Sequence, residues 1–173
     1  MNRLSKLTMS TMTVLCFGLV PLPGNAVAQQ KSLEEQLVGT WTFVSATEVQ
    51  KDGTKVDRWG PNPKGMLVFD ANGRYVLVIH RSDLPKFASN RVDQGTAEEN
   101  NAVIRGLIVT FGTYSVNEVD KTVTTQIEGG SFPNLYGKGQ KRIITSLTAE
   151  ELKYTNPAST IGATAQVVWK RAK

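Results

Sequence analysis

The sequence predicts an all-β fold, an up-and-down antiparallel barrel of about eight strands with one short helix. Eight segments rich in Val, Ile, Thr, Phe and Tyr are separated mainly by short polar turns, and alternation of apolar with polar residues is the period of a strand. Only residues 97–105 form a long run with apolar side chains at helical spacing. Successive antiparallel strands close into a barrel, which removes exposed edges. A barrel of about eight strands just holds one small ligand.

The predicted strands are joined by recognisable turns. The strongest hairpin signal is Asn72-Gly73, between the second and third strands, because both residues readily take the positive φ of a tight turn. In the first strand, alternation places Trp41 and Phe43 on the same face as Ser45. The predicted strands cover residues 40–50, 65–69, 74–81, 107–116, 122–128, 140–147, 151–155 and 163–171.

Two capping boxes predict where helices begin. Residues 32–35 (Ser-Leu-Glu-Glu) and 96–99 (Thr-Ala-Glu-Glu) each place a hydroxyl three residues before a glutamate, and these two side chains bond reciprocally to the backbone of a first helical turn. The first box predicts a single turn that ends before Gly39. The second predicts the main helix, residues 97–105, which Gly106 ends.

Residues 1–28 have the order of a secretory signal peptide. Basic residues come first, an apolar stretch over residues 7–20 follows, and Ala26 and Ala28 supply small side chains before a cleavage site. We therefore predict an exported protein, periplasmic or secreted, whose mature chain is one domain that begins at Gln29. The alternative of a membrane anchor needs a run of about 20 apolar residues, and this run is shorter and contains several Thr and Ser.

Cleavage would leave 145 of the 173 residues and lower the formal net charge from +5 to +3, because Arg3 and Lys6 leave and no acidic residue does. Cys16, the only cysteine, would leave too, and the bulky Leu15 before it disfavours lipidation. A mature chain without cysteine has no disulfide and no thiolate metal ligand. The mild charge and the lack of basic clusters predict no nucleic-acid partner, and we expect no stable membrane anchor after cleavage.

A family resemblance supports the barrel. Gly39-Thr40-Trp41 resembles the G-x-W signature of lipocalins and their calycin relatives, and Trp169-Lys170-Arg171 closes the last strand, where those folds often place a basic residue against that Trp. The resemblance therefore implies structural roles for Gly39, Trp41 and Arg171. Taken in order, residues 37–41, 65–69, 111–114, 127–129, 132–134 and 140–142 look like the lipocalin-like domain family of bacterial and fungal proteins.

The resemblance implies a calycin-type barrel over about residues 36–171 and a small apolar or amphipathic ligand. It does not imply any particular reaction. Members of the family often carry His in the strand that here reads Thr124-Thr125-Gln126. They also often carry an aromatic residue where Leu135 stands. These departures argue against inherited acid–base chemistry.

Three polar residues are the predicted centre of a ligand site. Glu128 ends one strand, Asn134 lies in the following loop, and Arg142 begins the next strand, so a hairpin would bring them together. Inside the barrel an Arg–carboxylate pair would orient a ligand, whereas outside it would be a surface ion pair worth about 0–1 kcal/mol. Asn134 is either part of a lid over the mouth or the cap of a packed turn.

Three aromatic residues are further candidates for ligand contact. Tyr75, Phe111 and Tyr114 lie on predicted strands. Packing in the core is the default role of such side chains, and lining a cavity is the sharper hypothesis.

The sequence shows no catalytic or metal constellation. His80 is the only histidine, and a metal would need two or three further ligands of other kinds. No serine stands in a nucleophile-elbow context. We therefore predict no catalytic residue, no metal and no cofactor.

Three functions compete at this point. The first is an exported carrier of a small hydrophobic or amphipathic molecule. The second is a cyclase or isomerase of apolar substrates with Glu128 as base and Arg142 or Asn134 stabilising charge, which needs a buried carboxylate with a raised pKa. The third is a protein-interaction module that uses loops 82–95 and 131–139. The sequence leaves the ligand and the oligomeric state open.

Overall fold

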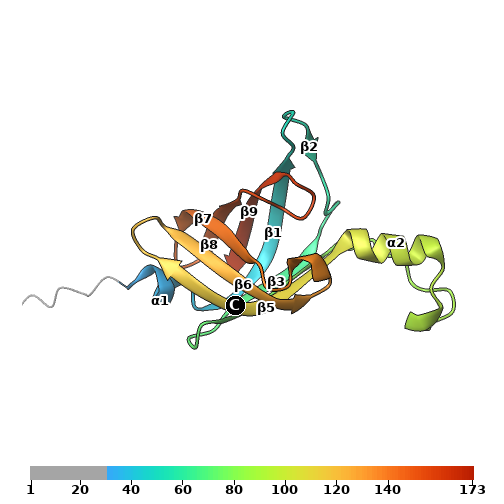
Figure 1. Ribbon diagram of the computed structural model, residues 1–173, viewed down its shortest axis with the longest axis horizontal. Coiled ribbons are helices and arrows are strands. Elements are labelled where there is room, and N and C mark those ends of the chain that lie inside the picture. Colours follow the sequence, from blue (N-terminus) through green and yellow to red (C-terminus); the bar gives the residue numbers. More distant parts are fainter. Residues whose placement is uncertain (1–30) are drawn as a thin grey trace, which may run out of the picture. The chain divides into compact units, whose positions relative to one another are not determined.

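The computed structural model describes residues 31–173, so the predicted signal peptide and its cleavage site lie outside the described residues. Figure 1 shows strands curled into a barrel, with a short helix at one end and a longer helix at the other. The strands are β1 (Gly39–Val49), β2 (Lys55–Val56), β3 (Lys64–Phe69), β4 (Arg74–His80), β5 (Leu107–Asn117), β6 (Thr122–Gly130), β7 (Gly139–Leu147), β8 (Glu151–Asn156) and β9 (Thr164–Arg171).

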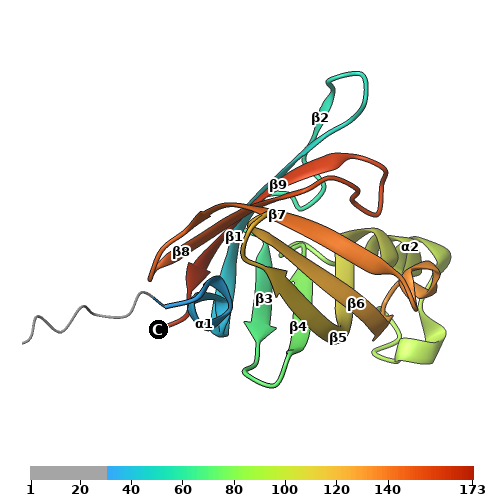
Figure 2. The ribbon, with the colours of Figure 1, turned by 60° about the vertical axis from the view of Figure 1, so that its left-hand side comes forward.

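The prediction of an up-and-down barrel is confirmed. The strands pair antiparallel in the order β1-β3-β4-β5-β6-β7-β8-β9, and β9 pairs with β1 to close the ring of eight. The additional strand β2, which the sequence did not reveal, pairs only with the end of β1 through Glu48 opposite Val56 and Val49 opposite Lys55. In Figure 2, β2 and its turn project away from the ring.

Both capping boxes are present. Ser32 and Glu35 bond reciprocally at the start of α1 (Leu33–Leu37), and Thr96 and Glu99 do the same at the start of α2 (Ala97–Gly106). Two 3₁₀ turns, η1 (Val92–Gln94) and η2 (Pro133–Leu135), lie in the predicted loops. No helix within residues 31–173 is long and apolar enough to cross a membrane.

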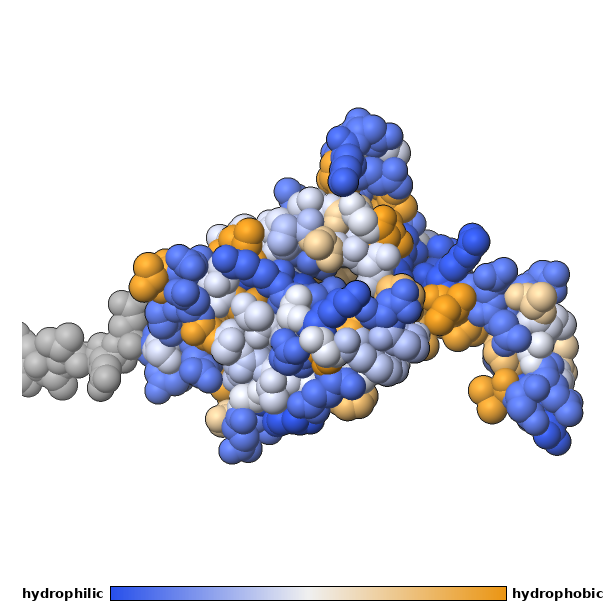
Figure 3. All heavy atoms as spheres, viewed as in Figure 1, coloured by the Kyte–Doolittle hydropathy of each residue, from blue (hydrophilic) through white to orange (hydrophobic). Residues whose placement is uncertain are grey.

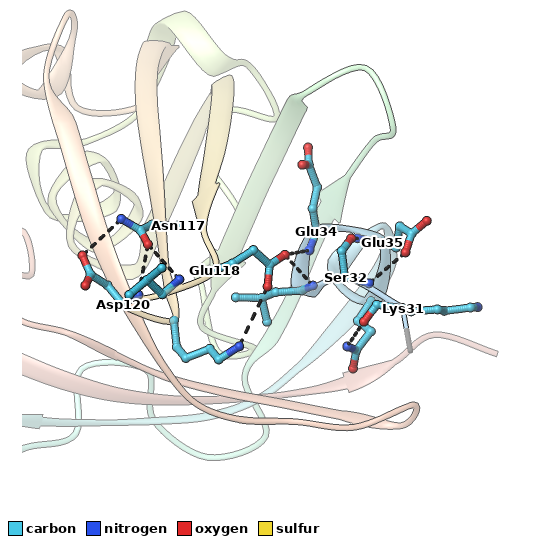
Figure 4. Close-up of polar contacts among 11 residues, drawn as sticks. Lys31, Ser32, Glu34, Glu35, Asn117, Glu118 and Asp120 are labelled. Carbon is cyan, nitrogen blue, oxygen red and sulfur yellow. Dashed lines mark hydrogen bonds and ion pairs between the residues drawn. The ribbon is translucent and has the colours of Figure 1, made fainter. Parts of the chain in front are cut away.

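The helix α1 covers one end of the barrel. Its apolar residues Leu33 and Leu37 are buried in the core. Glu118, in the turn between β5 and β6, accepts hydrogen bonds from the backbone N–H groups of Leu33 at 2.7 Å and of Glu34 at 3.4 Å (Figure 4). A carboxylate at a helix N-terminus satisfies orphan donors there. The contact therefore holds α1 against the strand ends, and this side is called the closed end below.

The open end lies opposite. The connections of residues 50–63, 81–106, 131–138 and 157–163 meet there, because they join the strand ends that point away from α1. The second of these carries α2, which extends away from the barrel in Figure 1. Binding residues lie disproportionately on loops that a rigid scaffold positions. The open end, where the long loops gather, is therefore the expected place of a functional site.

A bulge in β1 changes which side chains face inward. The register with β9 shifts between Phe43 and Ser45, so one residue is inserted relative to the partner strand. Trp41 and Phe43 face the core as predicted, but beyond the bulge Ala46 and Glu48 face inward and Ser45 is exposed. The expected alternation therefore fails after Phe43, and a carboxylate enters the barrel.

Candidate functional site

A pocket of about 590 Å³ lies at the open end of the barrel. Its rim combines apolar side chains with three arginines, Arg58, Arg81 and Arg105. In Figure 3, hydrophobic atoms gather where α2 joins the barrel, which is one side of this rim. We call this space the mouth pocket, and its apolar lining residues are Val56, Ile104, Leu107, Ile108, Phe132 and Ile161.

A smaller space of about 60 Å³ lies deeper in the barrel and is called the inner cavity. Arg58, Ile108 and Thr160 line both spaces and form their boundary. A cavity of about 10–15 Å³ holds one water, so the inner cavity has room for a few waters or one small polar group. Its polar lining comes from Glu48, Arg58, Thr110, Gln140, Arg142, Tyr154, Asn156, Ser159 and Thr160.

The connection before β3 fills part of the barrel with Trp59. This side chain is buried and packs edge-on against Phe43, with ring centres 6.2 Å apart. The Arg58 guanidinium lies over the Trp59 ring at 4.5 Å and donates to the Thr160 hydroxyl. Arg58 therefore links the connection before β3 to the one after β8, across the boundary between the two spaces.

Glu48 is a buried carboxyl group in the inner cavity. The residue is 3% exposed, and its Oε2 atom has no hydrogen-bond partner among residues 31–173. Burial raises the pKa of Glu48, while the Arg58 charge and the Ser159 hydroxyl act in the opposite direction. Burial in turn lowers the pKa of Arg58, and the charge of Glu48 opposes that shift. The two groups thus form a partly compensated pair inside the barrel.

Arg142 faces the interior from β7. Its guanidinium donates to Gln140 Oε1 at 2.6 Å, to Asn156 Oδ1 at 3.3 Å and to the Lys141 carbonyl at 3.2 Å. It also lies 5.8 Å from the centre of the Tyr154 ring. Burial raises the pKa of Tyr154, and the charge of Arg142 lowers it. The phenol therefore stays protonated and able to donate.

Tyr75 and Tyr114 both face inward, but in different surroundings. Tyr75 lines a further space of about 10 Å³ on the closed-end side of the inner cavity, together with Arg142 and Tyr154. Its hydroxyl has no partner in the described part of the chain. Tyr114 instead donates to the Asp70 carbonyl at 2.8 Å and packs against Phe69. Tyr75 is thus placed at the site, whereas Tyr114 belongs to the closed end.

The predicted cluster of Glu128, Asn134 and Arg142 does not form. Glu128 lies on the outside of β6 and accepts two hydrogen bonds from Arg74, at 2.8 and 2.9 Å. Val123 and Ile127 occupy the inner face of β6 instead, because burying a carboxylate costs far more free energy than burying an alkyl group. The Glu128 and Arg74 side chains are 44% and 50% exposed. Glu128 is therefore not the buried carboxylate that the enzymatic hypothesis requires as its base.

Asn134 and Phe111 also lie outside the barrel. Asn134 is an exposed residue of η2, where its neighbour Leu135 reaches the inner cavity instead. Phe111 is 41% exposed, and its ring covers Gly129 from outside, since a Cβ added there would lie 2.5 Å from Phe111 Cζ. The hypothesis that Phe111 lines the cavity is wrong because β5 directs Ile108, Thr110 and Tyr114 inward and Phe111 outward.

His80 is the last residue of β4, at the open end of the barrel. Its side chain is half-buried, and its Nδ1 lies 2.8 Å from the carbonyl oxygen of Arg81. Among residues 31–173 there is no group of three or more His, Cys, Asp or Glu side chains that could hold a metal ion. The polar side chains of the site are those of Glu48, Arg58, Arg142, Tyr75 and Tyr154.

Sequence reasoning missed Glu48, Arg58, Trp59 and Tyr154. A signal did exist for Trp59, because a large aromatic residue in an otherwise polar loop tends to pack inward. Glu48 had no such signal, since regular alternation from Trp41 places it outside. Only the bulge in β1 reverses its direction.

Eight antiparallel strands closed in a ring, covered at one end by α1 and open at the other onto a pocket, define a lipocalin-type barrel. The family model of the lipocalin-like domain matches residues 38–172, and the chain belongs to this family. The family resemblance of the sequence is thereby confirmed. No curated protein matches the chain.

Several solved structures are similar to this chain at low identity. A lipocalin-like protein from Bacteroides uniformis is 15% identical, with 79% of this chain and 99% of that chain covered and a TM-score of 0.42. Bovine odorant-binding protein in complex with a selenium-containing odorant is 16% identical, with coverage of 83% and 74% and a TM-score of 0.42. A redesigned β-barrel is 15% identical, with coverage of 83% and 100% and a TM-score of 0.43.

Proposed function

We propose that this chain is an exported barrel protein that binds one small amphipathic molecule through its open end. The observation that carries the proposal is that the two spaces adjoin, since Arg58, Ile108 and Thr160 line both the mouth pocket and the inner cavity. Export rests on the order of basic, apolar and small residues in positions 1–28.

The lining favours a ligand with two unlike ends. The mouth pocket has the volume of ordinary small-molecule sites, which is about 300–1,000 Å³, and six apolar side chains on its rim. The inner cavity is too small for a whole ligand and is rich in polar groups. An apolar body in the mouth pocket with a polar end in the inner cavity satisfies both linings.

Binding can be measured with N-phenyl-1-naphthylamine, a neutral apolar dye whose fluorescence rises in dry surroundings. We expect saturable binding, which Ile104→Asp weakens by about 10-fold because a charge then stands on the apolar rim. Val119→Asp is the matched control, since Val119 is an exposed apolar residue in the turn between β5 and β6 at the closed end. We expect this variant to bind as the parent does.

Two results would count against the proposal. One is a dye that does not bind the parent protein. The other is an equal effect of Ile104→Asp and Val119→Asp, which would place the dye somewhere other than the mouth pocket. Native mass spectrometry of the protein from its own host complements the dye, and we expect it to release a co-purifying small molecule.

A further inference from the structure

The buried guanidinium of Arg142 has no counter-ion among residues 31–173. The residue is 9% exposed. All its hydrogen bonds within residues 31–173 go to neutral oxygens of Gln140, Lys141 and Asn156. It takes no part in the five ion pairs between described residues. A buried charge that is not paired is costly and is retained in proteins mainly where it serves a purpose.

The other charges of the inner cavity do not compensate for it. Two guanidinium groups, Arg58 and Arg142, line this cavity together with one carboxyl group, Glu48. Glu48 interacts chiefly with Arg58. Its burial raises its pKa, which disfavours the charged form. The interior of the described barrel is therefore electropositive at Arg142.

Two tyrosines, Tyr75 and Tyr154, lie beside Arg142. Tyr75 is 3% exposed, and its hydroxyl lacks a partner in the described residues. Tyr75 and Tyr154 line the small space that Arg142 also reaches. A hydroxyl buried in this way is normally hydrogen-bonded, so the site offers a donor that has no acceptor.

We infer that the ligand carries a carboxylate, which enters the inner cavity first and is held there by Arg142, with the Tyr75 hydroxyl donating from the adjoining space of about 10 Å³ that Arg142 also lines. This inference rests on the proposed function, because it names the polar end of the amphipathic molecule. A planar guanidinium pairs with a carboxylate through two parallel hydrogen bonds. The space of about 60 Å³ suits such a headgroup and leaves the apolar body in the mouth pocket.

Matched ligands that differ only in the headgroup test the inference. Decanoate and decanol form a linear pair, and 2-naphthylacetate and 2-naphthaleneethanol form an aromatic pair. Each is titrated near neutral pH against bound N-phenyl-1-naphthylamine. We expect the carboxylates to displace the dye at about 10-fold lower concentration than the alcohols, as a hydrogen-bonded charge pair implies.

Variants then assign the preference to Arg142. Arg142→Met keeps an apolar stem similar to that of Arg but removes the charged guanidinium, and it should abolish the preference for carboxylates while leaving the alcohols unchanged. Tyr75→Phe should reduce the preference by about 3-fold through one lost hydrogen bond. The controls are Arg74→Met and Asn134→Ala, because both residues lie on the outside. They should retain the full preference.

The outcomes separate the inference from the proposed function. Dye binding with equal displacement by carboxylate and alcohol overturns the inference and leaves the proposed function intact. Failure of the dye to bind overturns both. Tighter displacement by decyl phosphate than by decanoate overturns the assignment of a carboxylate. If Arg142→Met fails to fold, Arg142→Lys replaces it, because lysine keeps the charge without the planar guanidinium. An unchanged preference for carboxylates in both Arg142→Lys and Tyr75→Phe would count against the site.

Discussion

The guanidinium carbon of Arg171 lies 4.0 Å from the centre of the Trp41 ring at the closed end of the barrel. Its nitrogens donate to the carbonyls of Gln36, Val38 and Ala149 at 2.6 to 3.0 Å. One side chain from the last strand thus stacks on the first strand and supplies acceptor groups of α1 with donors. The approach is so close that a Cβ at Gly39 would lie 2.7 Å from Arg171 Nη1.

We expect Arg171→Met to lower the free energy of unfolding by about 2–3 kcal/mol, because half-buried carbonyls lose charged donors. Urea denaturation measures this loss. Arg74→Met is the matched control, since it breaks the exposed pair with Glu128, and such pairs contribute about 0–1 kcal/mol. Equal losses in the two variants would show that Arg171 is no more than a surface charge.

The contact between Glu118 and α1 gives a second prediction. Glu118→Ala removes the acceptor of the Leu33 and Glu34 amides, and we expect a loss of about 1–2 kcal/mol together with faster hydrogen exchange in α1. Glu98→Ala is the control, because Glu98 is an exposed acid in the first turn of α2 outside the capping box. Unchanged exchange in α1 after Glu118→Ala would contradict the role of this contact.

Glu48 predicts an unusual dependence of stability on pH. Because burial raises the pKa of Glu48 in the folded state, folding favours its protonated form. The stability that this gives is fully present below the unfolded pKa and is lost as the pH rises through the folded pKa. Arg58 and Ser159 face Glu48 and reduce the effect without reversing it.

We therefore expect Glu48→Gln to be more stable than the parent by about 1 kcal/mol near pH 8, and the difference to vanish near pH 4. Urea denaturation of both proteins at the two pH values measures it. Taking the difference removes the contribution of every ionisable group that both proteins share. A difference that is the same at both pH values would contradict the argument.

Export and processing are predicted from the sequence alone. We expect the exported protein to begin at Gln29, as intact mass would show, because Ala26 and Ala28 occupy the positions where signal peptidases accept small side chains. Ala28→Leu should block cleavage after residue 28, whereas the intervening substitution Val27→Leu should not. Recovery of soluble protein that retains residues 1–28 would contradict the prediction.

The candidate site shows where sequence reasoning is limited. Arg142 and Tyr75 face the interior, whereas Glu128 and Phe111 lie outside. From the sequence, either face of β6 could point into the barrel, since Gln126 and Glu128 alternate with Thr125 and Ile127. The choice depends on which face the neighbouring strands turn inward, and one residue of shift would reverse it.

The sequence by itself determined the local features of this protein. The eight barrel strands, both capping boxes and the hairpin at Asn72-Gly73 follow from propensities and spacings over a few residues. Such signals act between near neighbours, so one chain is enough to detect them.

Only the tertiary structure decided what fills the barrel. The bulge in β1 exists relative to β9, which lies more than 100 residues away in the chain, and it turns Glu48 inward. The place of Arg58 over Trp59 likewise depends on the loop that carries Thr160. The direction of a side chain in a closed sheet depends on register with distant strands, and period-two alternation within one strand carries no information about that register.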